Sequence, residues 1–124
     1  MTYGPEIWPQ PDFSDDTGLS LDNATISDNA LHFAGAEEGA QICAMASPPE
    51  FGSGDVYHYM IQVDDYGGVG SRILLQISDA QVIIGPGFHQ GYVAVTTTSL
   101  LRFRDASGAR TASISSCSIR KYEE

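Results

Sequence analysis

Aromatic side chains and planar polar side chains lie close together in two short segments of this sequence. Aromatic rings stack on the C–H faces of pyranose rings, and planar polar groups meet the sugar hydroxyls. We predict two segments that carry both kinds to be loops, which supply binding residues readily. The candidate carbohydrate-binding residues are Asp65 and Tyr66 in the first segment and Phe88, His89, Gln90 and Tyr92 in the second.

The aromatic residues also have a structural interpretation. Tyr57, Tyr59 and Tyr92 lie in strand-like stretches, where tyrosines line a core or a groove. Trp8 is the only tryptophan and lies in an N-terminal segment rich in proline. We predict that Trp8 docks on a partner protein, because tryptophan is enriched at interfaces. The alternative is that Trp8 packs the N-terminal segment against its own domain.

The motifs of metal binding and catalysis are incomplete or absent. No calcium-loop motif is complete around Asp12–Asp22 or Asp64–Asp65, although a bound calcium ion remains the alternative. His32, His58 and His89 lack zinc spacing. The chain has no nucleophile elbow and no metalloprotease motif, and its size leaves little room for a deep cleft. We therefore predict no metal, no cofactor and no enzymatic activity; a carboxylate pair for glycoside hydrolysis is the open alternative.

The elements that must position the candidates are β-strands, because turn-forming residues interrupt every candidate helix. The longest strand signal, 56–63, places apolar residues on one face and His58 and Gln62 on the other. Asp28-Asn29 predicts a turn. Strands are predicted at 24–27, 30–34, 41–45, 56–63, 71–77, 81–84, 91–96, 100–104 and 112–122. About eight or nine strands at this spacing indicate an all-β protein, an antiparallel jelly-roll β-sandwich.

This sandwich is predicted to span residues 11–124, and residues 1–10 form an N-terminal segment that we interpret as a docking arm.

Acidic residues outnumber basic ones sixteen to six, giving a formal net charge of −10. Such a surface repels phosphate backbones, so we predict no nucleic-acid partner. No apolar run is long enough to insert into a membrane. Cys43 and Cys117 are expected to be free core cysteines, with a disulfide as the alternative.

Several stretches match the motifs of one family in order and spacing. They are Pro11–Ser14, Thr17–Leu21, Ala24–Phe33, Val56–Gly67, Gly91-Tyr92, Leu101–Phe103 and Ile114–Ile119. Together they resemble the carbohydrate-binding-module (galactose-binding-like) jelly rolls, especially those in phage, prophage and gene-transfer-agent structural proteins. Two positions depart from the family pattern. Leu19 replaces a common Trp and keeps an apolar side chain, whereas Ser115 replaces an aspartate that helps to hold calcium in some members.

The resemblance implies a non-enzymatic role with two alternatives. We expect a phage-like virion structural protein, such as a head decoration, fibre or tail-associated part, that docks on other particle proteins and contacts host polysaccharide. Symmetric particle parts are oligomers, so a homo-oligomer, a trimer or higher, is expected. The N-terminus lacks a secretion signal, so we expect production in the bacterial cytoplasm, unless a signal has been removed. The alternative is a soluble lectin-like module.

Overall fold

The fold consists of strands alone in the part of the chain that the computed structural model describes, residues 2–22, 24–33, 41–66, 73–85, 87–105 and 112–123. They are β1 (Thr2–Glu6), β2 (Leu19–Leu21), β3 (Ala24–Ser27), β4 (Ala30–Phe33), β5 (Gln41–Met45), β6 (Val56–Tyr66), β7 (Ile73–Ile77), β8 (Ala80–Ile84), β9 (Gly87–Ala94), β10 (Leu101–Asp105) and β11 (Ala112–Glu123). The predicted all-β class is confirmed.

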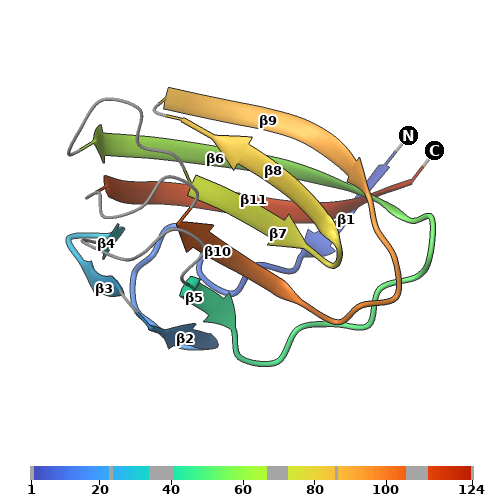
Figure 1. The fold of residues 1–124 in the computed structure, drawn as a ribbon, viewed down its shortest axis with the longest axis horizontal. Helices are drawn as coiled ribbons and strands as arrows, with labels where there is room; N and C mark the ends of the chain where they lie inside the picture. The colour runs from blue at the N-terminus through green and yellow to red at the C-terminus, as the bar shows by residue number, and fades with distance from the viewer. Residues whose placement is uncertain are drawn as a thin grey trace.

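Two antiparallel sheets pack against each other (Figure 1). Sheet A has the strand order β3-β4-β11-β6-β9, and β1 pairs with β11 beside this path. Sheet B has the order β2-β5-β10-β7-β8. Along each strand, successive side chains point alternately to the inner face, toward the other sheet, and to the outer face. This arrangement is the predicted jelly-roll sandwich.

The alternation predicted for 56–63 is present in β6, at the centre of sheet A. Tyr57, Ile61 and Val63 are buried on the inner face. His58 and Gln62 share the outer face, as the period of two residues requires. β6 continues to Tyr66, so the segment predicted as a loop at Asp64–Tyr66 is the end of a strand.

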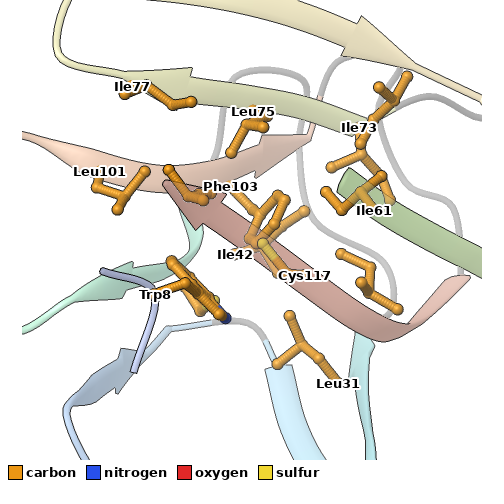
Figure 2. Close-up of a cluster of buried hydrophobic side chains, with 14 of the residues drawn as sticks. Trp8, Leu31, Ile42, Ile61, Ile73, Leu75, Ile77, Leu101, Phe103 and Cys117 are labelled. Atoms are coloured by element: carbon orange, nitrogen blue, oxygen red, sulfur yellow. The ribbon is translucent and has the colours of Figure 1, made fainter. Parts of the chain in front are cut away.

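The core between the sheets is made of aliphatic, aromatic and cysteine side chains from both inner faces. Figure 2 shows side chains of sheet B, on β7 and β10, pointing toward those of β6 and β11. Cys43 and Cys117 lie in this core as free thiols, as expected, and both are 0% exposed. The fully buried large side chains include Trp8, Phe13, Leu31, Ile42, Ile61, Ile73, Leu75, Ile77, Leu101, Phe103 and Ile114.

The turn predicted at Asp28-Asn29 joins β3 to β4 as a two-residue hairpin loop. Both residues have positive φ, 51° and 56°, and Ser27 pairs with Ala30 across the hairpin. Positive φ at both loop positions defines a type I′ turn, whose twist matches that of the strands. Asp and Asn tolerate this left-handed backbone better than most residues, which explains why the sequence turns here.

The N-terminal segment lies along β11 as part of the sandwich. Beyond β1, the Ile7 amide donates to the Ile119 carbonyl at 3.0 Å, and the Cys117 amide donates to the Pro11 carbonyl at 3.0 Å. Figure 1 accordingly shows the two ends of the chain close together. The boundary predicted at residue 10 therefore falls within one packed unit, and a docking role for this segment stays a prediction.

Trp8 is buried, which corrects the prediction that it presents a docking surface. Its side chain is 1% exposed and meets Phe103 at 5.2 Å and Phe13 at 6.2 Å between ring centroids, both edge-to-face. The indole N–H has no acceptor among the described residues. Burying so large an apolar ring outweighs one unmade hydrogen bond, so the alternative interpretation holds and Trp8 anchors the segment to its own core.

Candidate functional site

β9 carries most of the predicted binding residues, and it divides them between two faces. The strand was predicted to begin at residue 91, but it begins at Gly87, where φ is +105°. Phe88, Gln90 and Tyr92 are exposed on the outer face of sheet A. His89 lies on the inner face, opposite Ile61, with its Nε2 3.0 Å from the Gly85 carbonyl oxygen. His89 is therefore separated from the other three.

Tyr92 belongs to a group of four rings on the outer face of sheet A, which we call the outer-face cluster: Tyr3, His58, Tyr92 and Tyr122. Ring centroids lie 4.8 Å apart for His58 and Tyr92, 5.1 Å for Tyr92 and Tyr122, 5.1 Å for Tyr3 and His58, and 5.5 Å for Tyr3 and Tyr122. These separations are those of favourable aromatic pairs.

A hydrogen bond between two phenols closes the outer-face cluster. The hydroxyls of Tyr3 and Tyr92 lie 2.9 Å apart, although β11 and β6 separate their strands. The side chains therefore reach toward each other across the sheet, beside His58 and Tyr122. The bond raises the pKa of Tyr3 above its ordinary value of 10.0, and partial desolvation adds to the effect. The Tyr3 phenol is neutral at physiological pH with or without this shift, and it can donate a hydrogen bond.

Strand register explains how these rings meet. Tyr3 pairs with Tyr122 between β1 and β11, and His58 pairs with Tyr92 between β6 and β9. Cross-strand neighbours on one face of an antiparallel sheet have their Cβ atoms ~5 Å apart, within reach of each other's rings. Tyr3 and Tyr92 remain 44% and 54% exposed, so the cluster offers aromatic surface to solvent.

A hollow of about 630 Å³ adjoins the cluster where β6 begins and β11 ends. Lys121 lies there between two acids, with its Nζ 3.5 Å from an oxygen of Asp55 and 3.5 Å from an oxygen of Glu123. The charge of Asp55 is the main cause of the raised pKa of Lys121. The hollow is lined by Gly54, Asp55, Val56, Tyr92, Lys121, Tyr122 and Glu123.

The predicted and observed candidate residues overlap in part. Of Asp65 and Tyr66 only the backbone, at the end of β6, belongs to the described part, and their side chains lie outside it. Tyr59, for which core packing was one interpretation, is half-buried and packs against the core, and Tyr57 is 6% exposed.

Sequence reasoning missed Tyr3, His58 and Tyr122 as members of a site. His58 did carry a signal, because it faces away from the apolar positions of its strand. No sequence signal indicated the pairing of β1 with β11, because the two strands lie far apart in the sequence.

Within the described ranges, no group of three or more His, Cys, Asp or Glu side chains could hold a metal ion. No helix in the same ranges is long and apolar enough to cross a membrane. The chemistry that the outer-face cluster offers is binding: the exposed rings of Tyr3 and Tyr92 can stack on a ligand, their hydroxyls can form hydrogen bonds, and the adjoining hollow holds ammonium and carboxylate groups.

Comparison with known proteins places the fold among carbohydrate-binding modules. A mutant of a family 29 carbohydrate binding module matches with a TM-score of 0.54 and 13% identity over 97% of this chain and 91% of that one. Another family 29 module matches with a TM-score of 0.51 and 15% identity, covering 97% and 88%.

The module CBM6cm-2 from Cellvibrio mixtus lichenase 5A, in complex with cellotriose, matches with a TM-score of 0.50 and 14% identity, covering 98% and 100%. No protein-family model matches the chain. No curated protein matches it either. The chain thus has the jelly-roll fold of the carbohydrate-binding modules.

Proposed function

We propose that this protein is a non-enzymatic carbohydrate-binding module that holds a glycan on the outer face of sheet A. The observation that carries the proposal is the outer-face cluster, in which exposed rings from β1 and β9 meet over the sheet. Exposed aromatic rings that are grouped on one face often mark a binding site, whereas single exposed rings are common.

The chemistry of the site fits a sugar. A pyranose ring has C–H faces that pack on the rings of Tyr3 and Tyr92, and its hydroxyls find donors and acceptors in the adjoining hollow. Asp55, Lys121 and Glu123 supply charged groups there, and the tyrosine hydroxyls supply neutral ones. The fold shared with modules that bind carbohydrate supports this function by analogy.

A phage-like particle component was the first expectation from the sequence. The solved structures reported above are carbohydrate-binding modules, so the comparisons favour sugar binding, and the particle role stays a prediction. The same holds for particle proteins as partners, for the homo-oligomer and for the location in a virion. Glycan binding is compatible with that setting, because a particle part that touches host polysaccharide would use the same surface.

The test is binding to defined glycans. We would use affinity electrophoresis in gels that contain hydroxyethylcellulose, xylan or glucomannan, followed by calorimetry with cello-, xylo- and manno-hexasaccharides. We expect at least one to bind, and Tyr92→Ala to weaken binding at least about tenfold, ~1.4 kcal/mol, through loss of one stacking ring.

The matched control is Ile83→Ala. Ile83 is also a large exposed apolar residue, 58% exposed, but it lies on β8 in sheet B. Its replacement should leave glycan affinity unchanged. Phe88→Ala, on the outer face of β9, tests whether the bound chain extends along that strand. If no glycan binds the wild type, or if Tyr92→Ala binds as tightly, the proposed function is wrong.

A further inference from the structure

We propose that Glu6 is a positioning residue for glycan binding: it fixes β1 on β11 and so brings the Tyr3 ring to Tyr92. This inference rests on the proposed function, because it gives Glu6 an effect on affinity without contact with the glycan. It gives the N-terminal segment a second role in the binding site, because Glu6 holds in place the strand that carries the Tyr3 ring.

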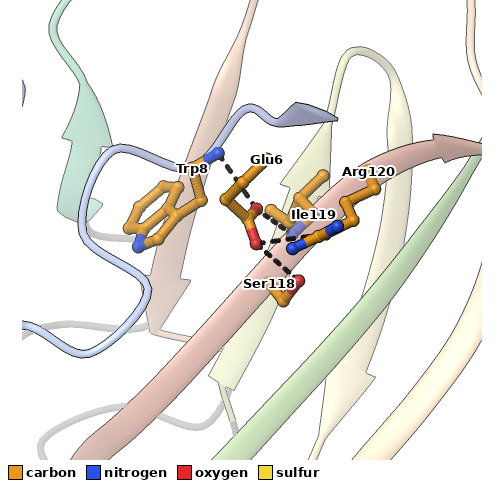
Figure 3. Close-up of polar contacts among 5 residues, drawn as sticks. All are labelled: Glu6, Trp8, Ser118, Ile119 and Arg120. Atoms are coloured by element: carbon orange, nitrogen blue, oxygen red, sulfur yellow. Dashed lines mark hydrogen bonds and ion pairs between the residues drawn. The ribbon is translucent and has the colours of Figure 1, made fainter. Parts of the chain in front are cut away.

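The carboxylate of Glu6 accepts three hydrogen bonds and forms an ion pair with Arg120 (Figure 3). One oxygen accepts the Ser118 hydroxyl at 2.5 Å and lies 3.7 Å from Nε of Arg120. The other accepts the backbone amides of Ile119 at 2.5 Å and of Trp8 at 3.3 Å. The side chain of Glu6 is 17% exposed, so these bonds are largely shielded from water. Charge-assisted bonds of this kind are the stronger ones in proteins.

The backbone pairing of β1 is short and irregular. Its register with β11 is limited to Thr2↔Glu123, Tyr3↔Tyr122 and Glu6↔Arg120, and it shifts between Tyr3 and Glu6. The strand also contains Pro5, which has no amide hydrogen to donate. The ladder is therefore interrupted between the residue that carries the ring and the residue that carries the carboxylate.

Glu6 lies between the buried Trp8 and the exposed Tyr3. On one side, the Trp8 indole is packed in the core, and the Ile7 amide bonds to Ile119 at 3.0 Å. On the other side, Tyr3 is 44% exposed and its ring contacts are those of the outer-face cluster. Figure 3 shows the Trp8 ring pointing away from the Glu6 carboxylate, so the two groups hold the segment from different directions.

Without the Glu6 carboxylate, β1 should separate from β11 more often, and the fraction of molecules with a complete cluster falls. A glycan then binds with an apparent affinity reduced by that fraction, because ordering β1 becomes part of the binding reaction. Glu6→Gln keeps the size of the side chain but places an amide donor among groups that are themselves donors.

The test compares Glu6→Gln, Tyr3→Ala and the double variant, using calorimetry with cellohexaose, or with the xylo- or manno-hexasaccharide if the wild type binds that one. Each single change should weaken binding about tenfold. The double variant should bind like Tyr3→Ala alone, because Glu6 acts through Tyr3. Glu50→Gln, the same change at an exposed glutamate, is the control and should bind like the wild type. Additive losses would overturn the inference.

A second arm needs no glycan and separates this inference from the proposed function. Amide hydrogen exchange should be faster in β1 of Glu6→Gln than of the wild type, and the ring NMR signals of Tyr92 should shift. If neither the exchange rates of β1 nor the Tyr92 signals change, the proposed role of Glu6 is wrong, even if the wild type binds a glycan. Failure of every glycan to bind the wild type would instead overturn the proposed function. If Glu6→Gln does not fold, Ser118→Ala, which removes one donor, takes its place in both arms.

Discussion

Raising the pH from about 8 to about 10 should destabilise this protein through its two core thiols. Burial raises the pKa of Cys43 from 9.0 to about 12, and the charge of Asp22 adds to the shift. Burial likewise raises the pKa of Cys117 well above 9.0, with contributions from Glu6 and Cys43. In the unfolded chain both thiols regain their ordinary pKa. A folded pKa above the unfolded one gives stability that is present at low pH and is lost as the pH rises.

The size of the loss follows from these values. At about pH 10 nine-tenths of each unfolded thiol is ionised, whereas the folded Cys43 with a pKa of about 12 stays almost fully protonated. Integrating from pH 8 gives about 1 kcal/mol for Cys43, and Cys117, whose pKa is also raised, adds a loss of the same sign. Such a loss is measurable in a small domain, whose stability is typically ~5–15 kcal/mol.

Urea denaturation with a reductant present, at several pH values between 8 and 10, measures this loss as a change in the free energy of unfolding. The variant Cys43→Ala/Cys117→Ala is the control. It should be less stable at pH 8, because the substitutions leave cavities, but its stability should fall less than that of the wild type between pH 8 and pH 10, by about 1 kcal/mol or more. Equal pH dependence in the two proteins would refute the reasoning, and so would a wild-type stability that does not change.

Two further changes test the packing and the turn. Trp8→Ala should lower the free energy of unfolding by ~3–5 kcal/mol, because it empties a fully buried site. The fluorescence of Trp8, the sole tryptophan of the sequence, should resist quenching by acrylamide in the wild type. Free quenching would contradict its burial. Asn29→Gly should stabilise the protein by ~0.5 kcal/mol in thermal melts, because glycine adopts the positive φ of this turn position without strain; a lower melting temperature would count against the type I′ assignment.

Local patterns in the sequence predicted local structure. The alternation in 56–63 and the Asp28-Asn29 pair depend on neighbouring residues, and the structure has β6 and the hairpin where they were expected. β9 was placed too late, because its exposed face mixes aromatic and polar residues and the apolar period is weak there.

The site depends on pairing between distant strands, and no local pattern reports it. Tyr92 was a candidate from its residue type and its place after a turn. Tyr3, His58 and Tyr122 join it only through the register of β1, β6, β9 and β11. The burial of Trp8 could not be predicted from the sequence for the same reason. A tryptophan in a proline-rich segment can dock on a partner or pack in its own core, and only its contacts with Phe13 and Phe103 decide between the two.

The pairing of Thr2 with Glu123 also has a consequence for folding. The entropy lost on closing a loop grows with its length, so the contact between β1 and β11 is among the least favourable to form early. We expect the hairpins β3-β4 and β7-β8 to form first and β1 to dock last. On the ribosome, Tyr3 can meet Tyr122 only after β11 has left the exit tunnel, so we expect the outer-face cluster to be completed late in folding.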